Sequence, residues 1–304
     1  MAFPDAAGTA LVSDGGLASA LEARGHDLSD GLWSARILLD HPAEVLAVHR
    51  AFYQAGAVIA TTASYQASFE GFAARGVDVD DTERLLRRSV ALARQARAEQ
   101  AGDGRPRWVA ASVGPYGAML ADGSEYRGRY GRSVRALTSW HRRRLEVLAG
   151  AGPDVLALET IPDADEAEAL IAGVAGLGVP AWLSYSIAGD RTRAGQPLAE
   201  AFAVAATAPE IVAIGVNCCA PSDVAAAVAT AREVTRKPLV AYPNSGEGWD
   251  PDGRAWVGPS RFSARDARGW IAAGVRVIGG CCRVGPAVIA DLARAVAPPV
   301  GLPS

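Results

Sequence analysis

Long apolar runs are missing from this chain of 304 residues. A transmembrane helix needs about 18–20 consecutive apolar residues, so we expect no contact with a membrane. The N-terminus, Met1 to Asp5, has no basic segment followed by an apolar core, and a secretory signal is therefore not expected. These two absences together predict a cytoplasmic protein.

Charge of one sign is also scarce, because 30 basic and 33 acidic residues leave a formal net charge of −3. Binding to a polyanion requires a concentrated basic face. The densest basic stretch, Arg142 to Arg144, falls on a predicted amphipathic helix, and we interpret it as a solvated face. Nucleic acid is therefore not expected as a partner, and the sequence predicts no oligomeric state.

Cysteine is rare, and its placement is informative. The four cysteines form two adjacent pairs, Cys218-Cys219 and Cys281-Cys282. Structural disulfides are uncommon in a reducing compartment, and clustered cysteines in a cytosolic enzyme indicate metal or redox chemistry. The alternative is that they are small buried hydrophobic residues, since free cysteine is commonly buried.

Eight short apolar runs recur along the chain, each followed by a turn signal and a helical pattern. The runs are Ala10–Asp14, Ala57–Thr62, Trp108–Val113, Val155–Glu159, Ala181–Ser186, Ile211–Asn217, Leu239–Tyr242 and Val275–Ile278. The expected helices are Pro42–Gly56, Asp81–Ala101, Arg132–Gly150, Asp163–Ala175, Leu198–Ala206, Ser222–Thr235, Ser263–Ala273 and Gly285–Ala297. Apolar strands that alternate with helices predict a parallel sheet covered by helices. Eight units favour an α/β fold with a single (β/α)8 barrel domain over residues 1–304.

Two other α/β architectures share part of this pattern. An open doubly wound sheet fits the same alternation, but no Gly-x-Gly-x-x-Gly follows the first strand. A barrel aldolase or sugar-phosphate enzyme needs a lysine at a strand end or a phosphate loop. The one lysine, Lys237, precedes a strand and lies at the opposite rim, and the four histidines (His26, His41, His49 and His141) are expected to be surface or packing residues.

Polar side chains and every cysteine follow the predicted strand ends. In a barrel the carboxyl ends of the strands meet at one rim, so thiolates after strands six and eight can share a metal about 2.3 Å from each sulfur. Gly279 and Gly280 would give the backbone before Cys281 and Cys282 conformations that larger residues avoid. Strand alternation indicates that only one of Cys218 and Cys219 is a ligand, and spacing does not decide which.

Several segments resemble the zinc-dependent homocysteine S-methyltransferase family. Gly215 to Cys218, followed by Gly279 to Cys282, is similar to its zinc signature, and the similarity extends over nearly the whole chain. Further segments are similar to the stand-alone bacterial and plant enzymes that use S-methylmethionine and, less readily, S-adenosylmethionine: Asp14–Ala18, Leu21–Gly25, Leu32–Ala35, Thr62–Ala67 and Tyr242–Glu247. One departure is Ser19-Ala20, where bacterial relatives often have Thr-Glu.

The resemblance implies a set of site residues. Its zinc ligands would be Cys218, Cys281 and Cys282, which leaves Cys219 without a ligand role. Glu159 matches a glutamate that receives the amino group of homocysteine. The remaining substrate-binding positions that it implies are Asp14, Trp33, Tyr65 and Asn217.

Methyl transfer to the sulfur of homocysteine explains why cysteine thiolates suit the metal site. A free thiol has a pKa near 8.5, and coordination to zinc deprotonates it. Three cysteine thiolates and the homocysteine thiolate on Zn2+ give a net charge of about −2, which keeps the sulfur nucleophilic. We expect direct transfer from a sulfonium donor without a protein general base, with Trp33, Tyr65 or Tyr242 facing the cation. The alternatives are a selenocysteine methyltransferase with the same site and a zinc-binding barrel without catalysis.

Overall fold

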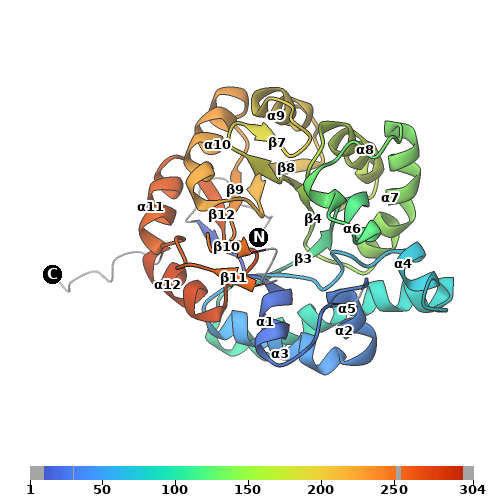
Figure 1. The fold of residues 1–304 in the computed structure, drawn as a ribbon. Coiled ribbons are helices and arrows are strands. Elements are labelled where there is room, and N and C mark those ends of the chain that lie inside the picture. Colours follow the sequence, from blue (N-terminus) through green and yellow to red (C-terminus); the bar gives the residue numbers. More distant parts are fainter. Residues whose placement is uncertain (1–9, 30, 251–254, 297–304) are drawn as a thin grey trace.

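The computed structural model describes residues 10–29, 31–250 and 255–296, and its framework is a closed barrel of parallel strands surrounded by helices (Figure 1). The barrel strands are β1 (Leu11–Val12), β2 (Ile59–Thr61), β3 (Trp108–Val113), β4 (Val155–Ile161), β5 (Ala181–Tyr185), β8 (Ile211–Asn217), β9 (Leu239–Tyr242) and β12 (Val275–Ile278). Their order in the sheet is β1-β12-β9-β8-β5-β4-β3-β2.

The two ends of this sheet join each other. Ser13 pairs with Ile59 in a parallel bridge, and the amide of Val58 donates to the carbonyl of Val12 over 2.7 Å. The predicted (β/α)8 barrel is therefore confirmed, and the open sheet is excluded for the described residues.

Eight helices cover the barrel, each with ends within two residues of those expected. They are α3 (Pro42–Gln54), α5 (Val79–Glu99), α7 (Val134–Ala149), α8 (Ala164–Val174), α9 (Leu198–Ala206), α10 (Pro221–Val234), α11 (Ala264–Ala272) and α12 (Pro286–Val296). The final residue expected in the last helix, Ala297, lies outside the described residues. No helix within the described ranges is long and apolar enough to cross a membrane.

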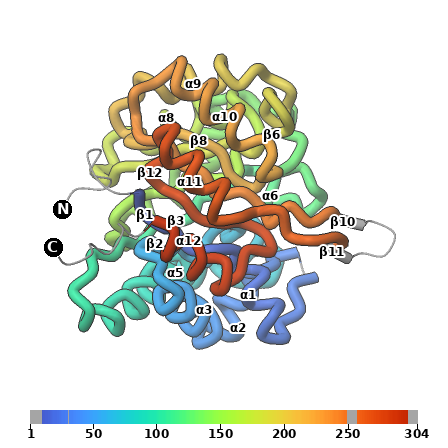
Figure 2. The backbone as a smooth tube through the Cα atoms, turned by 90° about the vertical axis from the view of Figure 1, so that its left-hand side faces the viewer, coloured from blue at the N-terminus to red at the C-terminus, as the bar shows by residue number. Residues whose placement is uncertain are grey.

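The sequence missed the short elements in the segments that connect the barrel strands and the long helices. They are α1 (Leu17–Ala23), α2 (Ser34–Asp40), α4 (Phe69–Ala73), α6 (Tyr116–Leu120), the 3-10 turns η1 (Ala101–Asp103) and η2 (Ser124–Tyr126), and the hairpins β6 (Ile187–Ala188)–β7 (Arg191–Thr192) and β10 (Gly248–Asp250)–β11 (Ala255–Val257). The β10–β11 hairpin stands out beyond one end of the barrel in Figure 2. Elements this short carry too few periodic positions for a sequence pattern to reveal them.

Alternation along the strands separates two apolar cores. Val155 and Ala157 of β4 pack inside the barrel, whereas Leu156 and Leu158 pack under the helices. The next inward position on β4 is Glu159, so the strand register aims its carboxyl group into the carboxyl end of the barrel.

The interpretation of Arg142 to Arg144 as a solvated face is wrong for Arg144, which is buried. Its guanidinium donates to the carbonyl of Gly114 over 2.6 Å and lies 3.0 Å from Nδ1 of His141. Nε2 of His141 in turn lies 2.9 Å from Oε1 of Glu166 on α8, and all three side chains are shielded from water. These contacts form a buried polar network between α7 and α8.

Candidate active site

A cavity of about 720 Å3 opens at the carboxyl ends of the strands. Seven of the residues named from the sequence line it: Asp14, Trp33, Tyr65, Glu159, Cys218, Cys281 and Cys282. They come from β4 and from the segments that follow β1, β2, β8 and β12, as well as from the turn before α2. The fold therefore brings together residues that are up to 268 positions apart, from Asp14 to Cys282.

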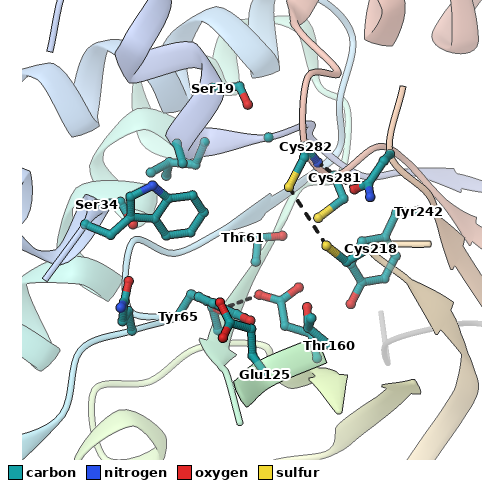
Figure 3. A pocket seen from close by; sticks show the side chains of 18 of the residues that line it. Ser19, Ser34, Thr61, Tyr65, Glu125, Thr160, Cys218, Tyr242, Cys281 and Cys282 are labelled. Carbon is teal, nitrogen blue, oxygen red and sulfur yellow. Dashed lines mark hydrogen bonds between the residues drawn. The ribbon is translucent and has the colours of Figure 1, made fainter. Parts of the chain in front are cut away.

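Three thiols form the most distinctive feature of this cavity (Figure 3). The sulfur atoms of Cys218, Cys281 and Cys282 all lie within 4.8 Å of one another, and Cys218 Sγ is 3.9 Å from Cys282 Sγ. Hydrogen bonds from Cys281 and Cys282 hold the pKa of Cys218 well below the ordinary thiol value. Three convergent sulfur ligands, one of them poised to be a thiolate, suit a soft metal ion.

Backbone geometry separates Cys218 from its neighbour Cys219. Cys218 has a φ of 49°, in the left-handed region that non-glycine residues rarely adopt, and its amide donates to the carbonyl of Tyr242. This turn points Cys218 into the cavity, whereas Cys219 is fully buried in the apolar core between sheet and helices. Burial raises the pKa of the Cys219 thiol, which keeps it neutral.

The expected role of the glycines before Cys281 needs correction. Neither Gly279 nor Gly280 has a φ in the left-handed region. A Cβ on Gly279 would lie 2.7 Å from the carbonyl oxygen of Asp14, and one on Gly280 would lie 2.1 Å from a methyl carbon of Val284. Close packing, not an unusual backbone conformation, is what requires glycine here.

Two buried carboxyl groups stand on the cavity wall. Asp14 accepts hydrogen bonds from the amide of Thr61 (2.6 Å), the hydroxyl of Thr61 (2.8 Å) and the hydroxyl of Ser13 (3.1 Å). Glu159 accepts a hydrogen bond from Ser112. Burial nevertheless dominates and raises the pKa of each carboxyl group to about 7. Each group can therefore gain charge near neutral pH, when a cation arrives.

Asn217 does not line the cavity, contrary to expectation. Its Oδ1 accepts hydrogen bonds from the amide of Thr160 (2.7 Å) and the hydroxyl of Ser184 (2.8 Å), and its Nδ2 donates to Oγ1 of Thr160 (2.8 Å). Thr160 has a φ of 59° and follows Glu159 directly. The side-chain amide of Asn217 is fully buried, and its hydrogen bonds are made to Thr160 and Ser184. These contacts hold the backbone next to Glu159.

Aromatic rings form another part of the wall. Trp33 and Tyr65 meet edge to face with ring centroids 6.2 Å apart. Tyr242 also lines the cavity, where its hydroxyl accepts from Trp182 and contacts the hydroxyl of Ser184. All three rings named for the sulfonium thus border the same space as the thiols.

Three further cavity residues, Glu125, Tyr126 and Arg193, were missed. Glu125 and Tyr126 belong to η2, and the Tyr126 hydroxyl lies 3.5 Å from Cys218 Sγ. Arg193 follows β7, and its guanidinium carbon lies 5.7 Å from the centre of the Tyr126 ring. Their segments read as irregular loops, and the one available signal was that long loops after barrel strands build active sites.

Comparison with known proteins agrees with this geometry. The family model described as homocysteine S-methyltransferase matches residues 11–296. This chain belongs to that family. It is 46% identical to homocysteine S-methyltransferase 4 of Zea mays (97% of this chain, 91% of the relative). It is also 43% identical to selenocysteine Se-methyltransferase of Brassica oleracea var. italica (91% of this chain, 86% of the relative).

A solved structure of a family member provides a second comparison. The metallated form of the homocysteine methyltransferase MmuM from Escherichia coli superposes with a TM-score of 0.85 and 44% identity, covering 95% of this chain and 96% of that one. The chain is therefore a methyltransferase of the homocysteine S-methyltransferase family. Its three-cysteine cluster and the metallated relative together point to a bound metal.

Proposed function

We propose that the protein is a zinc-dependent homocysteine S-methyltransferase that takes its methyl group from a sulfonium donor. One observation carries the proposal: three thiols converge on the wall of a cavity that also contains two buried carboxyl groups. A thiol-rich metal site activates a sulfur nucleophile, and a buried carboxylate binds the ammonium group of an amino acid.

Zinc is the metal that this site fits best. The donor atoms are three cysteine sulfurs, and thiolates select zinc among the divalent ions that are common in cells. Cys218, Cys281 and Cys282 would hold the zinc, which would lower the pKa of the homocysteine thiol so that its proton is released to water. Thiols stay free of disulfides in a reducing compartment, so the proposal includes a cytoplasmic location.

The side chains of this protein then bind and orient the two substrates. Glu159 receives the ammonium group of homocysteine, and Asp14 adds a second negative charge close by. Trp33 and Tyr65 line the cavity, where a sulfonium cation placed over a ring face is stabilised.

The reaction needs alignment and no protein base. A bond forms between the acceptor sulfur and the methyl carbon, while the bond between that carbon and the donor sulfur breaks. Its electron pair stays on the donor sulfur, which becomes neutral. With S-methylmethionine as donor, both products are methionine, and S-adenosylmethionine is the second donor that we propose.

Selenocysteine is a second candidate acceptor, favoured by the 43% identity to the Brassica selenocysteine Se-methyltransferase. A selenol is activated at a thiol-rich metal site in the same way. Parallel assays with homocysteine and selenocysteine as acceptors, each with S-methylmethionine, compare the two.

The deciding experiment combines a methyl-transfer assay with metal analysis of the purified protein. We expect one zinc per chain and methionine formation from homocysteine and S-methylmethionine. One bound zinc per chain without methyl transfer from any sulfonium donor would overturn the enzymatic proposal.

A further inference from the structure

Glu125 is an acidic residue that the reaction as described above leaves without a role. It lies in η2, between the short helix α6 and α7, and it lines the cavity together with Glu159 and the three cysteines. In Figure 3 its side chain lies beside Tyr65, and the cysteines occupy another side of the opening. Burial raises the pKa of the Tyr65 phenol, and the nearby negative charges of Cys218 and Glu125 add to this effect.

The carboxyl group of Glu125 is poorly satisfied by the protein. Its Oε2 is buried and has no hydrogen-bond partner. Among the described residues, no arginine, lysine or histidine forms an ion pair with it, whereas Arg283, also near the cavity, pairs with Glu247. A buried oxygen without a partner is unfavourable, and such an atom at a binding site is well explained by a ligand that supplies the missing donor.

The charges of the two proposed substrates account for the unpaired carboxylate oxygen of Glu125. Homocysteine brings one ammonium group, which Glu159 receives. A sulfonium amino acid brings two cations, its sulfonium and its own α-ammonium. The sulfonium must face the acceptor sulfur at the cysteine cluster, so the ammonium of the donor reaches a different part of the wall.

The two cations of the methyl donor differ in whether they can donate a hydrogen bond to Glu125. A sulfonium has no N–H or O–H and cannot satisfy the Oε2 atom, but it suits the rings of Trp33 and Tyr65. An ammonium group has three donors and forms a strong charge-assisted hydrogen bond with a carboxylate. We propose that Glu125 binds the α-ammonium group of the methyl donor and thereby selects amino-acid sulfonium compounds.

This inference rests on the proposed function and assigns a residue to the donor side of the site. Burial raises the pKa of Glu125, a hydrogen bond from its own backbone amide opposes this shift, and the negative charge of Cys218 adds to it. The ammonium group of the methyl donor compensates the buried negative charge of Glu125, just as the ammonium group of homocysteine compensates that of Glu159.

The test is steady-state kinetics of Glu125→Gln, which keeps the shape of the side chain and removes its charge. We expect the KM for S-methylmethionine to rise at least tenfold, the size typical of a lost hydrogen bond to a charged group. The KM for homocysteine should stay within about twofold. Glu168→Gln, an exposed position on α8, is the matched control and should leave both values unchanged.

A desamino analogue of S-methylmethionine separates the two cations of the donor. Wild-type protein should show a kcat/KM at least tenfold lower for the analogue than for S-methylmethionine, and Glu125→Gln should show little difference between them. An equal loss with both donors would assign Glu125 to the sulfonium instead, and an unchanged donor KM would remove it from the donor site; either result overturns the inference. If the wild-type protein forms no methionine at all, the proposed function fails, which is a distinct result.

Discussion

At the scale of single residues, the two adjacent cysteines after β8 have opposite environments. Cys218 faces the other two thiols, whereas Cys219 is packed in the apolar core. We predict that Cys218→Ala abolishes metal binding, and that Cys219→Ala retains about one metal per chain and loses only about 1 kcal/mol of stability, as for a deleted methylene group. Metal analysis of both purified variants checks this, and the reverse pattern would contradict the assignment of ligands.

The raised pKa of Glu159 makes the stability of the protein depend on pH. Its pKa in the folded protein, about 7, is above its ordinary value of 4.5. The neutral form is thus favoured by the fold, and this contribution to stability is lost as the pH rises through 7. Without bound amino acids, we predict that Glu159→Gln and wild type have similar stability at pH 5.5, and that the variant is more stable at pH 8.5 by on the order of 2 kcal/mol.

Thermal or urea unfolding of both proteins at the two pH values measures this difference. Addition of homocysteine should reverse the order at high pH, because its ammonium group compensates the carboxylate only in the wild type. Parallel stability curves for the two proteins over this range would show that Glu159 is already ionised in the fold.

At the scale of elements, the network between α7 and α8 holds the loop after β3 in place. Arg144 binds the carbonyl of Gly114, and Glu166 accepts the amide of Tyr116 over 2.5 Å, so both residues anchor the segment that leads to Glu125 and Tyr126. The charge of Arg144 is buried and balanced by Glu166.

Arg144 and Glu166 are joined through His141, and removing the Glu166 charge leaves the buried guanidinium uncompensated. We predict that Glu166→Gln lowers the free energy of unfolding by about 3–5 kcal/mol. The same change two residues later, Glu168→Gln, lies on the exposed face of α8 and should cost less than about 0.5 kcal/mol. Urea denaturation compares the two variants, and equal midpoints would show that the network contributes nothing to stability.

At the scale of the whole molecule, the barrel has an extensive apolar core that is independent of the metal site. Side chains from all eight strands and their helices are buried in the two clusters inside and outside the sheet. Unlike a zinc finger, which unfolds without metal, this chain should therefore stay folded when the metal is removed.

Chelation nevertheless has a measurable effect, because an ion that binds only the folded state stabilises it by mass action. We predict a lower Tm after EDTA treatment, by an amount that corresponds to about 4 kcal/mol when free metal exceeds its Kd a thousandfold. Cys218→Ala should show no response to EDTA in the same thermal scan. Loss of all cooperative unfolding on chelation would mean that the metal is required for folding.

The sequence alone determined the barrel and the position of the site along the chain. Hydrophobic runs of strand length, separated by helical patterns, are local features, and each β-strand and long helix of the barrel was located from them. The order of the chain also places the carboxyl end of every strand at one rim, so topology brings Asp14, Glu159 and both cysteine pairs to that rim. The resemblance to a family selected Cys218 over Cys219, which periodicity did not.

Only the tertiary structure decided how these side chains meet. The left-handed turn at Cys218 depends on its contact with Tyr242, and the position of Asn217 beneath Thr160 depends on β4, 57 residues earlier in the chain. Glu125 and Arg193 lie in segments without periodicity. The helical pattern around Arg144 predicts a solvated face, but the packing of α8 against α7 buries its side chain. These features arise from contacts between distant segments, and such contacts leave no local pattern because burial and hydrogen bonding are decided by packing.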